Sequence, residues 1–267
     1  MKFIIAGLCL ILAINAGLQA QDISKSDWRS TGLIVDGNNT DWILPFNFYD
    51  KSTGLSFDIS NNSSHIFLFF MTNDNMKMKK MINAGWQIQL SSNEKNKKFS
   101  ATISFPAVAI LETENVIDQN TIRSDMDLNS WINEYKLFFP GIKTKGFKTK
   151  NGDLQLIDTT GINIAIGTDS LKNLCYEISI PLNELLENNL INLNEVLQMN
   201  IKINPMKIHE GEKKYNEDLY GSRNYGQGPG SIGRGYNQGT QNYETPYVGD
   251  MLQYNYAKQA FRLTGNQ

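Results

Sequence analysis

The chain has 267 residues, 40% of them hydrophobic, enough to bury the core of one large all-β domain or of two small domains, and we favour one. Its 25 Lys and Arg residues against 27 Asp and Glu give a formal net charge of −2. Because this charge gives no overall field that would attract phosphates, we expect no nucleic-acid partner.

The first twenty residues have the layout of a secretory signal peptide. Lys2 precedes the apolar run from Phe3 to Ile14, and Ala16, Gly17 and then a small residue at Ala20 follow, after which we expect cleavage. The apolar run is shorter than the roughly 20 residues that a membrane-spanning helix needs. We therefore expect residues 21–267 to form a periplasmic or extracellular protein without a membrane span. Cys175 is its single thiol and is predicted to be a small buried hydrophobe.

The predicted fold begins in the stretch GLIVDGNNTDW at residues 32–42. We interpret its apolar start as a short strand that ends in a turn at Asp36-Gly37, where glycine accepts a positive φ and Asp36 can accept bonds from the amides that follow. Asp41 and Trp42 close the stretch. We expect Trp42 to cover the end of the fold, and direct contact with a ligand is the alternative.

Two strands and a helix follow. Leu55 to Ser60 alternates between apolar and polar residues, whereas His65 to Thr72 is apolar on both faces, as in a central strand covered on both sides. Asp74 or Asn75 can cap a helix that Gly85 ends. Its apolar positions are Met78, Met81 and Ile82, and its lysines Lys77, Lys79 and Lys80 are predicted to be a solvated face, with a basic patch for an acidic polymer as the alternative.

The rest of the chain adds more short alternating segments. Trp86 to Leu90 and Phe99 to Phe105 read as an antiparallel pair, and Pro181 to Leu186 reads as a short helix begun by proline. Further strands are predicted at residues 154–157, 162–166, 174–180, 197–203 and 257–264. Many short strands with few helices predict an all-β fold, an antiparallel β-sandwich that is jelly-roll-like.

A segment of different composition interrupts this pattern at about residues 215–256. It is dominated by Gly, Asn, Gln and Tyr, which cannot bury much apolar area, so we expect a long flexible insertion before the last strand. The predicted organisation is one β-sandwich domain over residues 21–267 that carries this insertion.

Two short motifs resemble a known family. Val35-Asp36-Gly37 followed by Asp41-Trp42 is similar to the opening of family 9 carbohydrate-binding modules and related secreted bacterial proteins. The order of the later segments, up to Phe105-Pro106, is similar as well, so the likeness covers residues 31 to 106. The resemblance implies an antiparallel sandwich that binds sugar through aromatic side chains.

Three aromatic residues are candidates for a ligand site. Sugar rings stack on flat aromatic faces, and their hydroxyls bond to amides and carboxylates. We select Trp131 and Tyr135, from a polar region between strands, and Trp86 at the start of a strand. For Trp86 burial in the core is the favoured alternative, and for Trp131 both interpretations stay open.

These patterns favour a non-catalytic protein that binds a glycan or a small molecule. An interaction protein that works through the Tyr- and Gly-rich insertion is the second hypothesis, and a glycan-processing hydrolase is the third. A Ser-His-Asp site would need His65 or His209 to meet a serine and a carboxylate. His65 opens an apolar strand after a turn, and His209 lies in a segment without metal-ligand spacing. We expect no cofactor; calcium is the ion that the abundant Asp, Asn and Glu favour, without a ligand set that the sequence defines.

Overall fold

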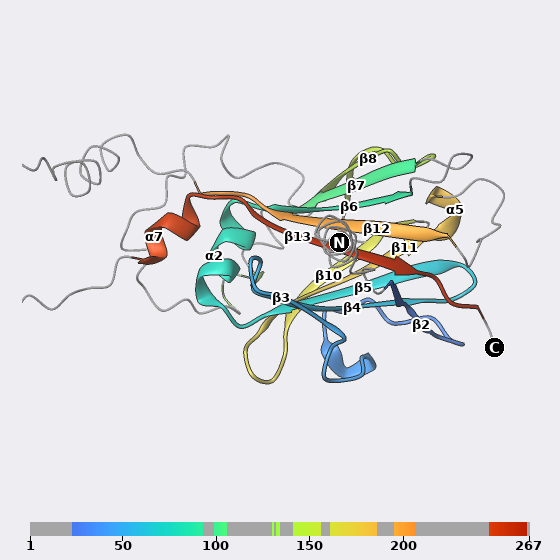
Figure 1. Cartoon of the computed structure of the whole chain (residues 1–267), viewed down its shortest axis with the longest axis horizontal. Helices are drawn as coiled ribbons and strands as arrows, with labels where there is room; N and C mark the ends of the chain where they lie inside the picture. Colours follow the sequence, from blue (N-terminus) through green and yellow to red (C-terminus); the bar gives the residue numbers. More distant parts are fainter. Residues whose placement is uncertain are drawn as a thin grey trace, which may run out of the picture.

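Two stacked β-sheets make up the body of the protein in the computed structural model (Figure 1). The structure describes residues 23–92, 99–105, 130, 132–133, 141–155, 161–185, 195–206 and 246–265. Within these ranges the seven-stranded sheet has the order β1 (Ser24–Lys25), β13 (Asn255–Arg262), β12 (Val196–Ile203), β6 (Trp86–Ser92), β7 (Phe99–Phe105), β8 (Gly141–Lys145) and β9 (Gly152–Gln155). The six-stranded sheet has the order β10 (Asn163–Thr168), β11 (Leu174–Pro181), β5 (His65–Thr72), β4 (Leu55–Asn61) and β2 (Asp27–Trp28), with β3 (Phe48–Asp50) also paired with β4.

The predicted all-β sandwich is confirmed. Neighbouring strands are antiparallel except for β1 beside β13 and β2 beside β4, which are parallel. These two short strands are not predicted by the alternation of the sequence, and neither are β3 and β8. Each is too short, or too polar, to show a period of two clearly.

The space between the sheets is filled by alternating apolar side chains. Trp86, Ile88 and Leu90 of β6 are buried there, opposite Leu68 and Phe70 of β5. Each such side chain contributes about 1.5–3 kcal/mol through burial, which makes this layer the main source of stability.

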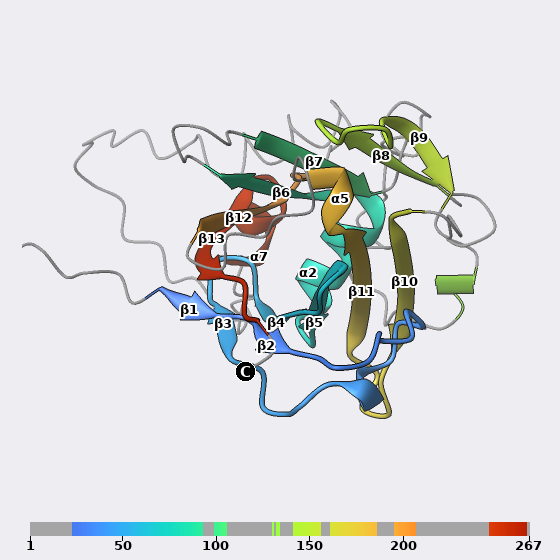
Figure 2. The same cartoon turned by 90° about the vertical axis from the view of Figure 1, so that its right-hand side faces the viewer.

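The central strand β5 is buried on both faces, as predicted. Its Phe67 and Phe69 point away from the other sheet and are covered by the segment before β3, through Leu33, Trp42 and Phe46. Figure 2 shows this segment passing under β5, β11 and β10.

Two details predicted for this segment are wrong. Residues 32–35 are not a strand, and Ile34 is 71% exposed. Trp42 covers the outer side of the six-stranded sheet, where its ring centroid lies 5.3 Å from that of Phe69, rather than the end of the sandwich. The short helix η2 (Asn39–Asp41) leads into Trp42.

The predicted helices are present. Helix α2 (Asn75–Asn83) is capped by Asp74, which accepts bonds from the Met76 and Lys77 amides, and Gly85 follows it with φ +75°. Helix α5 (Leu182–Leu185) follows Pro181. No helix among the described residues is long and apolar enough to cross a membrane.

The predicted solvated face of α2 is wrong. Lys77, Lys79 and Lys80 are all buried. Lys77 and Lys80 contact helix α7 (Pro246–Met251) and the turn that follows it, which pack against α2. Residues 246–256, the end of the predicted insertion, thus form α7, that turn and the start of β13. Residues 207–245 lie outside the described residues. Cys175 is buried as predicted.

Candidate functional site

The Asp36-Gly37 turn and Trp42 enclose a buried carboxylate of the protein itself. Glu177, fully buried on β11, accepts bonds through Oε2 from the amides of Asp36 (3.0 Å) and Gly37 (3.2 Å). Its Oε1 accepts a bond of 2.9 Å from Trp42 Nε1. Burial raises the pKa of the Glu177 carboxyl, and these three bonds oppose that rise.

The rest of this turn is held by backbone geometry. Gly37 has φ +80°, and a Cβ atom there would lie 2.7 Å from the Gly167 nitrogen. Asp36 Oδ1 accepts a bond from the Asn38 amide, and the Asp41 carbonyl accepts one from the Arg29 guanidinium. The groups of the VDG and DW motifs are therefore engaged with the six-stranded sheet.

The sequence-selected ligand residues do not come together among the described residues. Trp86 is 2% exposed and meets Phe70 and Tyr176 edge to face, with ring centroids 5.2 and 4.8 Å away. The Trp86 ring is therefore part of the hydrophobic core, the alternative favoured for this residue. Trp131 and Tyr135 lie outside the described residues.

The two histidines are also not brought together with a serine and a carboxylate among the described residues. His65 Nδ1 lies 2.8 Å from Ser64 Oγ in the turn before β5, and burial lowers the pKa of His65. The Asn62 side chain, an amide rather than a carboxylate, accepts a bond from Ser64 Oγ. His209 lies outside the described residues.

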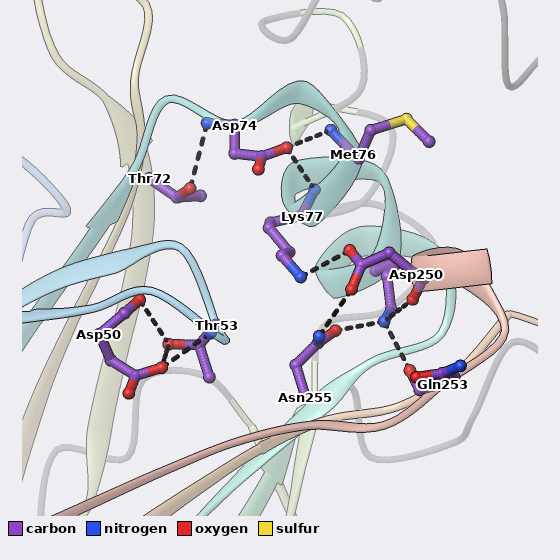
Figure 3. A network of polar contacts seen from close by, with 10 residues as sticks. Asp50, Thr53, Thr72, Asp74, Met76, Lys77, Asp250, Gln253 and Asn255 are labelled. Atoms are coloured by element: carbon purple, nitrogen blue, oxygen red, sulfur yellow. Dashed lines mark hydrogen bonds and ion pairs between the residues drawn. The ribbon is translucent and has the colours of Figure 1, made fainter. Parts of the chain in front are cut away.

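A network of polar side chains joins α2 to α7 at one end of the sandwich (Figure 3). Lys77 Nζ lies 2.6 Å from Asp250 Oδ2. Lys80 Nζ donates to the carbonyls of Asp250 and Gln253, both at 2.7 Å, and to Asn255 Oδ1. Since the three protons of the Lys80 ammonium group meet three oxygens, Lys80 is fully bonded within the protein, and these contacts hold α2 against α7 and the turn that follows it.

The pKa values of this network follow from its burial and contacts. Burial lowers the pKa of Lys80 to about 8, although the nearby Asp250 opposes this. Burial would raise the pKa of Asp250, but the bonds from Lys77 and Asn255 lower it below its ordinary value.

The outer face of the seven-stranded sheet, the side turned away from the other sheet, carries the polar residues of each alternating strand. Strand pairing arranges them in rows. One row is Tyr256, Lys202, Gln87, Ser104, Lys143 and Asp153; the next is Lys258, Asn200, Gln89, Thr102 and Lys145; a third is Ala260, Gln198, Ser91 and Ser100. The centre of the face is therefore a block of amides and hydroxyls.

Two tyrosines lie at the β13 side of this block. Tyr254 and Tyr256 are 48% and 56% exposed, and their ring centroids are 5.8 Å apart with an interplanar angle of 34°. Lys202 Nζ lies 4.1 Å from the centroid of the Tyr254 ring. The ammonium group thereby helps to hold that ring against the sheet.

The central amides are ordered by bonds to one another. Asn200 Nδ2 donates to Gln89 Oε1 at 3.2 Å, and Gln89 Nε2 donates to Ser100 Oγ at 2.8 Å. An amide fixed in this way still has a free donor or lone pair to offer to a ligand. Exposed aromatic rings beside ordered amides make the outer face of the seven-stranded sheet the candidate site.

The amides of this face can be found in the sequence, but their neighbourhood in the sheet cannot. The outward positions of two predicted strands, Gln87 and Gln89 in one and Gln198 and Asn200 in the other, are all amides. The strands are separated by more than a hundred residues, and alternation does not say that they are neighbours. Their pairing in the sheet brings the amides together.

A metal site is not among the features of the described part of the chain. No group of three or more His, Cys, Asp or Glu residues within the described ranges could hold a metal ion.

Comparison with protein-family models, characterised proteins and solved structures finds no match for this chain.

Proposed function

We propose that the protein binds carbohydrate, and that it does so on the outer face of the seven-stranded sheet. The observation that supports this most is the exposed pair Tyr254 and Tyr256 beside the ordered amides Gln89 and Asn200. The proposal includes export by the predicted signal peptide and a binding role outside the cytoplasm.

The chemistry of the face matches that of a sugar chain. A sugar ring has an apolar C–H side that stacks on an aromatic ring, and hydroxyl groups that both donate and accept hydrogen bonds. Amide side chains also do both, so a row of amides can meet hydroxyls in several orientations.

The size of the face favours an extended ligand. From Tyr256 on β13 to Lys143 on β8 a row crosses four strand spacings. At about 4.8 Å per spacing this is about 19 Å, long enough for an oligosaccharide rather than a single sugar.

The test is a calorimetric titration of residues 21–267 with a panel of soluble polysaccharides. We expect Tyr256→Ala to weaken binding about tenfold, because one stacked aromatic is worth about 1–2 kcal/mol. The matched control is Tyr49→Ala, a tyrosine 68% exposed on β3 of the other sheet, which should bind like the wild type. Equal affinity of both variants and the wild type would contradict the proposal.

The predicted insertion is the competing site, and its deletion separates the two hypotheses. The deletion should span residues 216–244 and leave α7 intact, because Asp250 contacts Lys77 and Lys80. Loss of binding in the deletion, together with unchanged binding in Tyr256→Ala, would assign the function to the insertion.

A further inference from the structure

We propose that the ligand of this face is an anionic polysaccharide that bears carboxylate or sulfate groups. The inference rests on the proposed function and names its ligand class. It starts from the charges of the outer face, which differ in sign from the formal net charge of −2 of the whole chain.

The outer face of the seven-stranded sheet is cationic. The register places one carboxylate, Asp153, on this face within the described strands. The cations on the same face are Lys25, Lys143, Lys145, Lys202, Lys258 and Arg262. The described strands therefore present an excess of positive charge to an anion that approaches this face.

The cations lie on both sides of the amide block. Lys202 and Lys258 are next to it on β12 and β13, and Lys143 and Lys145 are next to it on β8. A polysaccharide that bonds to the central amides would bring its charged groups within reach of cations on both sides of the block. The distance from β13 to β8 is four strand spacings, or about 19 Å.

Within the part of the chain that the structure describes, these cations are largely left without a carboxylate partner. Within the described ranges the ion pair is Lys77 with Asp250, which lies at the α2 end. Lys143 lies opposite Asp153 across β8 and β9, and the other outer-face cations have no ion pair with a described carboxylate. Lys25 even lies opposite Arg262 across a strand pair, an arrangement of like charges that costs stability. Lysines on an edge strand can be explained by the need to prevent aggregation through the sheet edge. Lys202 is on the inner strand β12, so this explanation does not apply to it.

Among anionic polymers, a glycan fits better than a nucleic acid. A glycan offers hydroxyl groups to the central amides along its length and charged groups to the cations, whereas the phosphate backbone of a nucleic acid meets mainly the cations.

The test compares polymers that differ in charge on the same backbone. Polygalacturonate is compared with its fully methyl-esterified form, and dextran sulfate with dextran; single-stranded DNA is a fifth probe. We expect at least one charged polymer to bind about tenfold more tightly than its neutral partner at low ionic strength, with the preference lost near 0.5 M salt, where charges are screened within a few ångströms. The two pairs distinguish carboxylate from sulfate.

Charge-removing variants locate the effect. Lys202→Gln and Lys258→Gln should each weaken binding of the charged polymer about two- to fivefold, since an exposed ion pair is worth up to about 1 kcal/mol. The control is Lys51→Gln, an exposed lysine in the turn after β3, which should not change affinity. Unfolding midpoints equal to that of the wild type show that the variants are folded.

The outcomes separate this inference from the proposed function. Equal binding of charged and neutral polymers, reduced by Tyr256→Ala but not by the lysine variants, overturns the anionic ligand and leaves carbohydrate binding in place. No binding of any polysaccharide overturns both, as does tight binding of the DNA alone.

Discussion

At the scale of single residues, the turn of the VDG motif and the tryptophan of the DW motif together bind one buried carboxylate. Asp36 and Gly37 do form a turn, as their types predict. The turn directs the amides of Asp36 and Gly37 at the buried carboxylate of Glu177, to which the Trp42 indole also donates. That partner is 140 positions away and could not be predicted from local sequence.

Gly37 gives a direct test of this turn. We expect Gly37→Ala to destabilise the protein by about 2–4 kcal/mol, because alanine disfavours a positive φ and its Cβ would collide with the Gly167 backbone. Gly32→Ala is the matched control, since a Cβ there has no atom within 4 Å and should change stability by less than about 0.5 kcal/mol. Urea unfolding measures both, and equal stability of the two variants would show that the turn is not held as described.

At the scale of elements, alternation predicts the long strands well and their surroundings poorly. The limits of β5 agree with the predicted residues His65 to Thr72, and those of β7 with Phe99 to Phe105. The sequence predicts helix α2 with its cap but places its lysines in solvent, because nothing in the local pattern shows that α7 packs against this helix.

Lys80 tests the contact between α2 and α7. At pH 7 we expect Lys80→Met to be about 1–3 kcal/mol less stable than the wild type, because the part-buried carbonyls of Asp250 and Gln253 and the buried Asn255 side chain lose their donor. Lys51→Met, an exposed substitution, is the control.

The same pair of proteins gives a pH dependence with a defined sign. The Lys80 pKa is about 8 in the folded state and 10.5 as its ordinary value, so between these pH values the unfolded chain binds more protons. The wild type should therefore gain stability relative to Lys80→Met as pH rises from 8 to 10.5. A constant difference across this range would contradict the assigned burial of the ammonium group.

At the scale of the whole molecule, the fold class follows from sequence but the candidate site does not. Alternating strands of this length have few stable arrangements other than two packed sheets. The outer face is different, because Gln89 meets Asn200 and Lys202 meets Tyr256 only after distant strands have paired. The aromatic residues selected by sequence either lie in the core, as Trp86 does, or lie outside the described residues.

The closing of the sandwich also belongs to this scale. Ser26, between β1 and β2, bonds to Asn61 at the end of β4, and the Thr264 hydroxyl after β13 donates to the Ser26 carbonyl at 3.0 Å. The two sheets are thus joined where the described chain begins and ends.

The most direct test of the central claim is to observe the side-chain amides of the outer face during a glycan titration. In nuclear magnetic resonance spectra of isotope-labelled protein, we expect the side-chain amide signals of Gln87, Gln89, Gln198 and Asn200 to shift as a binding polysaccharide is added, while that of Asn47, bonded to Asp58 in the other sheet, stays in place. Saturating binding that leaves all four outer-face signals unmoved would contradict the assignment of the site.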